Sequence, residues 1–96
     1  MVSINEELKV AKAAKAAIDA LLKTPKSAVL VTLVKAKHAA VFNPSSGAAL
    51  NEARANVGIA LSILIHGMPT QEKIDKAKFA IDVWIRELEA ASRQRC

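Results

Sequence analysis

The segment Asn56–Ile65 constrains the fold of this 96-residue chain more than any other part of it. It lies within the longest stretch that has no charged residue, and its only polar side chains are Asn56 and Ser62. A helix that crosses a bilayer needs roughly 20 apolar residues, so this segment is too short to be one. We therefore expect it to be the buried half of a helix, either in a protein core or in a subunit interface.

The composition favours an all-α fold. Hydrophobic residues make up 52% of the chain but aromatic residues only 3%, so Leu, Ile and Val must fill the core, with many alanines as spacers. Alanine is the best helix former, and most of the few Gly and Pro residues lie where helices would end or begin. The single cysteine, Cys96, cannot form an internal disulfide, and we expect it to be an inert residue of a frayed terminus.

Helical periodicity divides the chain into four segments. Apolar residues recur every three or four positions, most regularly in the last segment. Thr24 is expected to cap the second helix, Gly67 to end the third and Thr70 to cap the fourth. We predict one domain, an antiparallel up-down-up-down four-helix bundle, because such short connections place consecutive helices antiparallel. The expected helices span residues 3–23, 25–42, 47–66 and 71–92.

One segment allows a different fold. Ala28–Val34 reads A-V-L-V-T-L-V, which on residue propensity alone is typical of a strand. Its one candidate strand partner is Val57–Ile65, and pairing the two would give a small α/β fold. We favour a helix because Ala28–Val34 continues without a turn signal into K-A-K-H-A-A.

The sequence offers little for catalysis or metal binding. It has no zinc-type cysteine pair, no H-E-x-x-H, no nucleotide-binding glycine loop and no nucleophile elbow. In the predicted bundle, His38 and His66 lie at opposite ends, roughly 10 Å or more apart, and cannot share a metal ion. Asp75 and Asp82 each have a cation within helical reach, which is typical of a solvated ion-pair face. We expect no catalytic, cofactor-binding or metal-binding residues, and no enzyme.

The net charge of +5 is unevenly distributed. Residues 1–42 carry seven Lys against three acidic residues, whereas residues 43–96 have a net charge of only +1. Residues 1–42 contain no Arg, the most frequent reader of guanine, and no aromatic residue among the lysines to stack on bases. These absences argue against base recognition, so a solvated lysine face is the simpler explanation of the uneven charge. A small basic accessory protein that binds nucleic acid is the alternative function. The candidate anion-binding or nucleic-acid-binding residues are Lys9, Lys12, Lys15, Lys26, Lys35 and Lys37.

Two helices have more apolar surface than a monomer needs. The second helix is apolar nearly all round, as is the second half of the third, although each helix of a bundle should keep a polar face. Surplus apolar surface commonly marks an interface, although a helix at the middle of a compact bundle would look similar. We expect a non-catalytic protein–protein interaction module (an adaptor, inhibitor or assembly subunit) that forms homo-oligomers. The candidate interface residues are Val29, Leu33, Val41, Phe42, Ile59, Ile63 and Ile65.

The charged residues near helix starts complete the prediction. Glu6 and Glu7 lie in the first turn of the first helix, where the helix dipole favours acidic side chains. They also stand where a signal peptide would have basic residues, so we expect a cytoplasmic protein. Arg54 interrupts the apolar pattern of the third helix near its start, which we expect to be exposed.

Overall fold

The computed structural model describes residues 4–21, 23–42, 48–68 and 70–94, and within these ranges every regular element is a helix. The all-α class is thus confirmed for the part of the chain that is described. The two apolar runs that an α/β fold would have paired as strands are helical, one in α2 and one in α3. The helices are α1 (Ile4–Ala20), α2 (Lys26–Phe42), α3 (Ala48–His66) and α4 (Gln71–Gln94).

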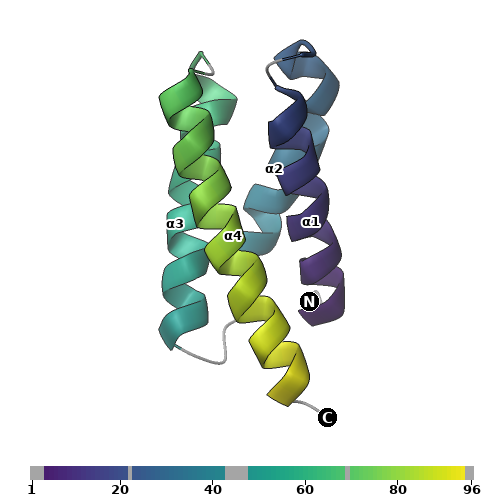
Figure 1. The fold of residues 1–96 in the computed structure, drawn as a ribbon, viewed down its shortest axis with the longest axis vertical. Helices are drawn as coiled ribbons and strands as arrows, with labels where there is room; N and C mark the ends of the chain where they lie inside the picture. The colour runs from purple at the N-terminus through teal and green to yellow at the C-terminus, as the bar shows by residue number, and fades with distance from the viewer. Residues whose placement is uncertain (1–3, 22, 43–47, 69, 95–96) are drawn as a thin grey trace.

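The four helices pack against each other in a ring (Figure 1). Helix α1 contacts α2 and α4, and α3 contacts the same two helices from the other side. The bundle measures 39 Å along its longest axis and 19 Å along each of the other two. At about 1.5 Å per residue, the 24 residues of α4 span most of that length. Because each helix contacts two neighbours around the ring, it has one side in the core and one side turned outward.

Local hydrogen bonds explain where three of the helices begin or end. Helix α1 ends at Ala20, before the predicted boundary, because Thr24 donates both its backbone N–H (2.9 Å) and its hydroxyl (2.8 Å) to the Ala20 carbonyl. The prediction that Thr24 caps the second helix is therefore wrong, since its hydroxyl closes the first. The other two predictions are confirmed: Thr70 Oγ1 accepts from the Lys73 N–H at 3.3 Å, and the Gly67 N–H donates to Ile63.

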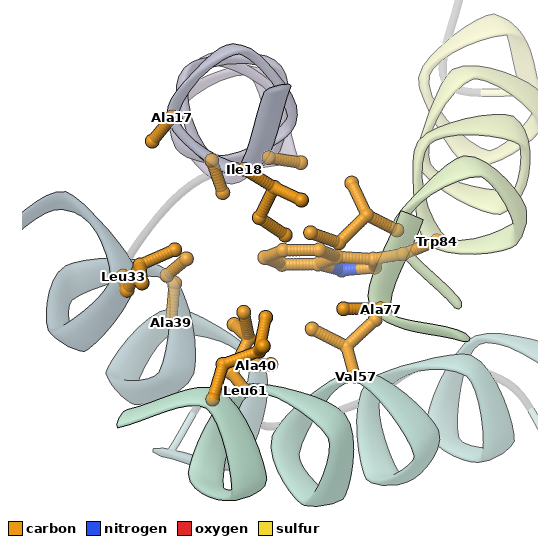
Figure 2. Close-up of a cluster of buried hydrophobic side chains, with 14 of the residues drawn as sticks. Ala17, Ile18, Leu33, Ala39, Ala40, Val57, Leu61, Ala77 and Trp84 are labelled. Carbon is orange, nitrogen blue, oxygen red and sulfur yellow. The ribbon is translucent and has the colours of Figure 1, made fainter. Parts of the chain in front are cut away.

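The core is built around the single tryptophan, Trp84, which is fully buried (Figure 2). Alanines line the core sides of α1 and α2, so these two helices approach closely, while larger side chains from α3 and α4 fill the centre. Val57 and Leu61 are both 0% exposed, as expected for the uncharged segment of α3. Burial covers only one side of that segment, however, because Ile59 and Ile63 point into solvent.

Leu61→Ala should lower the free energy of unfolding by about 2–5 kcal/mol, because truncating a fully buried leucine removes apolar contacts and leaves a cavity. Urea denaturation followed by circular dichroism would measure it. Glu52→Ala is the matched control on the exposed side of the same helix and should change stability by less than about 0.5 kcal/mol. Wild-type stability in Leu61→Ala would show that α3 does not form the core in this way.

Candidate functional site

The predicted interface residues on α2 do not form a surface. Leu33 is 0% exposed and belongs to the core, so its place in the predicted interface is wrong. Val29 is half-buried and packs against the core. The side chains of Val41 and Phe42 lie outside the described part of the chain, so their assignment stays a prediction. Among the α2 side chains that the structure describes, the large apolar one that is exposed is Val31, which sequence reasoning did not select.

The predicted residues on α3 are placed differently. Ile59 is 63% exposed and Ile63 is 46% exposed, whereas Ile65 is half-buried and packs against the core. Two further exposed apolar residues, Met68 and Phe79, follow on the α3–α4 connection and on α4. Four of the five large apolar side chains found exposed in the described ranges therefore belong to α3, α4 or their connection.

A groove of about 480 Å³ runs between α3 and α4. Helix α3 lines it with Ile59 and Ile63, and α4 lines it with Phe79 and Val83. Ala60 and Ala80 also line it, and their small side chains leave its floor open. We call this feature the α3–α4 groove; a volume of this size lies in the range of ligand and peptide sites.

The charged residues at the rim of the groove are locally satisfied. Lys76 forms an ion pair with Glu72 at 3.4 Å, one turn away on the same helix. The Lys73 ammonium donates to the Met68 carbonyl at 3.3 Å. The rim carries two lysines and one glutamate, and each of them already interacts with a neighbouring group. The electrostatic potential at the rim is therefore weak. The groove is therefore suited to an apolar occupant rather than to a highly charged one.

A second hollow lies on the opposite flank of the same two isoleucines. It is lined by Ala55, Gly58 and Ser62, together with Ile59 and Ile63 themselves. The two isoleucines thus form a ridge along α3, with the α3–α4 groove on one side and a hollow of small residues on the other. Ridges beside grooves are the surface relief by which helices pack against each other.

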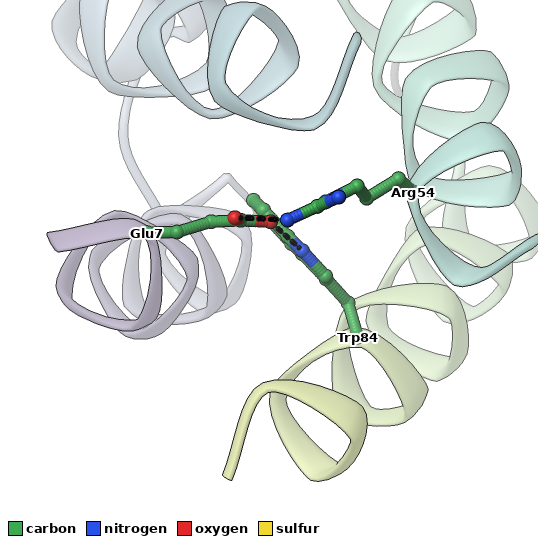
Figure 3. A network of polar contacts seen from close by, with 3 residues as sticks. All are labelled: Glu7, Arg54 and Trp84. Carbon is green, nitrogen blue, oxygen red and sulfur yellow. Dashed lines mark hydrogen bonds and ion pairs between the residues drawn. The ribbon is translucent and has the colours of Figure 1, made fainter. Parts of the chain in front are cut away.

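The protein also contains a buried polar network that sequence reasoning missed. Arg54 is only 3% exposed and donates through Nε (2.8 Å) and Nη2 (2.6 Å) to the two carboxylate oxygens of Glu7, which is 0% exposed. The indole Nε1–H of Trp84 donates to Glu7 Oε2 at 2.7 Å (Figure 3). The prediction of an exposed Arg54 is therefore wrong. Glu7 lies in the first turn of α1, as predicted, but its side chain is buried.

This network joins three helices, because Glu7 comes from α1, Arg54 from α3 and Trp84 from α4. Both carboxylate oxygens already accept hydrogen bonds, and neither hollow described above is lined by any of the three residues. The network therefore fixes the helices relative to one another rather than presenting reactive groups to a substrate. A sequence signal did exist: Glu7 and Arg54 both occupy core positions of their helical patterns, and a buried Trp needs an acceptor.

The candidate basic residues are only partly brought together. Lys9, Lys12 and Lys35 are exposed, and Lys37 is half-buried, while the side chain of Lys26 lies outside the described part. Lys15 instead forms a 2.7 Å ion pair with Asp82 of α4. This contact joins two helices, and the spacing of charges within α4 alone does not predict it.

A second ion pair joins the same two helices, between Lys78 of α4 and Asp19 of α1 at 2.8 Å. The hydrogen bond and the charge of Asp19 raise the pKa of Lys78 above its usual value. Lys78 is therefore charged in this pair at neutral pH, and it loses that charge as the pH rises through the raised value. Because both side chains are about half exposed, the pair orients α1 against α4 more than it stabilises the bundle.

The histidines lie apart from these features, and both His38 and His66 are exposed. In the described ranges, no three His, Cys, Asp or Glu side chains come close enough to hold a metal ion. Cys96 lies outside those ranges. Helix α3 is the one described helix that is long and apolar enough to cross a membrane, but the core helix of a soluble protein meets the same criteria.

Comparison of the chain with protein family models, curated proteins and solved structures finds no match. The site must therefore be interpreted from its own geometry.

Removing one member of the buried ion pair should be strongly destabilising. Glu7→Leu or Arg54→Leu alone leaves a buried charge without its partner, which typically costs about 3–5 kcal/mol. The double variant should recover much of this loss, because an apolar pair often replaces a buried ion pair at little cost. The recovery should be incomplete, since the Trp84 N–H would keep no acceptor.

Urea denaturation of the two single variants, the double variant and the wild type forms a complete double-mutant cycle. Glu52→Gln, at an exposed position two residues from Arg54 on α3, is the control and should change stability by less than about 0.5 kcal/mol. Additive losses in the double variant would contradict the pairing of Glu7 with Arg54.

Proposed function

We propose that this chain is a non-catalytic protein–protein interaction module, an adaptor, inhibitor or assembly subunit, whose docking surface is the α3–α4 groove. The observation that carries the proposal is the gathering of exposed Ile59, Ile63 and Phe79 along one groove of the bundle. Contiguous exposed apolar surface is costly for a soluble monomer and commonly marks an interaction site.

The dimensions of the groove suit a helical occupant. Its lining on α3 extends from Ala53 to Ile63, a distance of about 15 Å at 1.5 Å per residue. That length corresponds to about three helical turns, which is the usual footprint of an amphipathic helix lying in an apolar groove. Ile59, Ile63 and Phe79 are the anchors on the protein side, because they combine high exposure with large apolar side chains.

Two further inferences accompany this proposal. We infer that consecutive helices run antiparallel in an up-down-up-down order, which is supported by the ring of helix contacts and by the short connections. We also propose a cytoplasmic location and no cofactor. In this arrangement the outward side of α3 and α4 is a continuous face of the bundle.

Nucleic-acid binding is the second candidate, favoured by the exposure of Lys9, Lys12 and Lys35. The pairing of Lys15 with Asp82 removes one cation from that set. Binding that depends on phosphate contacts weakens steeply with salt, whereas docking through the apolar groove should be nearly insensitive to salt. Titration of a fluorescent duplex at several salt concentrations would separate the two.

Photo-cross-linking tests the proposed docking surface directly. A benzophenone amino acid at position 79 should capture a discrete protein partner in extract of the native organism, because Phe79 lines the groove and is 73% exposed. The same amino acid at position 31 is the control, since Val31 is similarly exposed, on α2. Excess wild-type protein should abolish the adduct and excess Ile59→Asp should not. Identical adducts from both positions, or none, would contradict the proposal.

A further inference from the structure

The outward side of α3 lacks the polar character expected of a bundle helix. From Ala55 to His66 its exposed positions carry Ala55, Asn56, Ile59, Ile63 and His66, with no Asp, Glu, Lys or Arg. The buried residues of this half are Val57, Gly58, Leu61 and Leu64. Because Ile59 and Ile63 are exposed, the helix carries large apolar side chains on both sides. A second apolar side on a helix that already contributes to the core calls for a second covering surface.

We propose that this surface is covered by the same face of a second copy of the chain, in a two-fold symmetric dimer centred on Ile59 and Ile63. The inference rests on the proposed function, since it names the partner of the same docking surface. In such a dimer, the ridge of each copy enters a hollow of the other, and Phe79 of each copy covers the rim of its neighbour's groove.

The relief of the face is self-complementary, as a two-fold interface requires. Ile59 and Ile63 are one helical turn apart and stand between two hollows, the α3–α4 groove and the one lined by Ala55, Gly58 and Ser62. Two identical ridges, each flanked by a groove, can interdigitate by the packing of i±4 rows that is commonest between helices. The small residues allow the second copy to approach closely, and the isoleucines supply the apolar contact.

The charge distribution favours this face over the side formed by α1 and α2 for contact between copies. Residues 43–96, which contain α3 and α4, have a net charge of +1, against +4 for residues 1–42. Two copies that met through α1 and α2 would bring Lys9, Lys12 and Lys35 of each close together. On the α3–α4 side, the rim lysines already have acceptors, so the repulsion between copies is small.

The available length is also sufficient. One long side of the bundle extends 39 Å by 19 Å, so the helices of a second copy can lie along its whole length. A single short helix lying in the groove would cover only part of this face and would leave the hollow beside Gly58 open. A second copy covers the ridge and both hollows together.

Sedimentation of the purified 96-residue chain from about 1 μM to about 1 mM tests the proposal, because a dimer of moderate affinity dissociates within that range. Ile59→Ser and Phe79→Ser should each raise the dimer dissociation constant at least about tenfold and leave the circular dichroism spectrum unchanged. Val31→Ser is the matched control, an equally exposed apolar residue on α2, and should leave the dissociation constant unchanged.

A cysteine pair gives an independent readout. In a Cys96→Ser background, Ile59→Cys should form a disulfide-linked dimer under mild oxidation, because residue 59 lies near its own symmetry mate. Val31→Cys in the same background should not. A chain that stays monomeric at every concentration, or a dimer that tolerates Ile59→Ser and Phe79→Ser, would overturn the inference. A monomer that still gives the specific adduct from position 79 would overturn the dimer alone and leave the docking function standing.

Discussion

The buried ion pair between Glu7 and Arg54, completed by the Trp84 indole, is the interaction on which the rest of the structure depends. Removing two charges from water is expensive, and the cost is recovered only when the geometry is good and the donors are satisfied. Here the guanidinium donates twice to one carboxylate, and the indole donates to the same group. This geometry requires α1, α3 and α4 to hold one rotation and one register relative to each other.

The rotation of α3 connects this network to the proposed function. Helix α3 is apolar on both sides, so hydrophobic burial alone would not decide strongly which side faces the core. Arg54 decides it, because its guanidinium must reach Glu7 inside the bundle. Ile59 and Ile63 follow Arg54 by five and nine residues and are consequently carried to the outward side. The interaction that fixes the core thereby also sets which residues can form the docking surface.

Regular amphipathic patterns made the helices, the core side of α4 and two of the helix ends predictable. The pattern of α2 is less informative, because a helix that is apolar nearly all round does not indicate which side faces the core. For this reason the prediction places the buried Leu33 on the surface and omits the exposed Val31. Arg54 interrupts the apolar pattern of α3, and a single charged residue normally marks a solvent-exposed position, so the pattern predicts exposure where the structure shows burial. The ion pair between Glu7 and Arg54 joins two residues that are 47 apart in sequence, which local patterns do not reveal.

The indole proton of Trp84 tests the central claim most directly, because the chain has one tryptophan and its N–H gives a single nuclear magnetic resonance signal. If that N–H is buried and bonded to Glu7, it should exchange with solvent only through global unfolding, at a rate set by the full stability of the bundle. Exchange as fast as that of an exposed indole would contradict the network, and with it the orientation of α3.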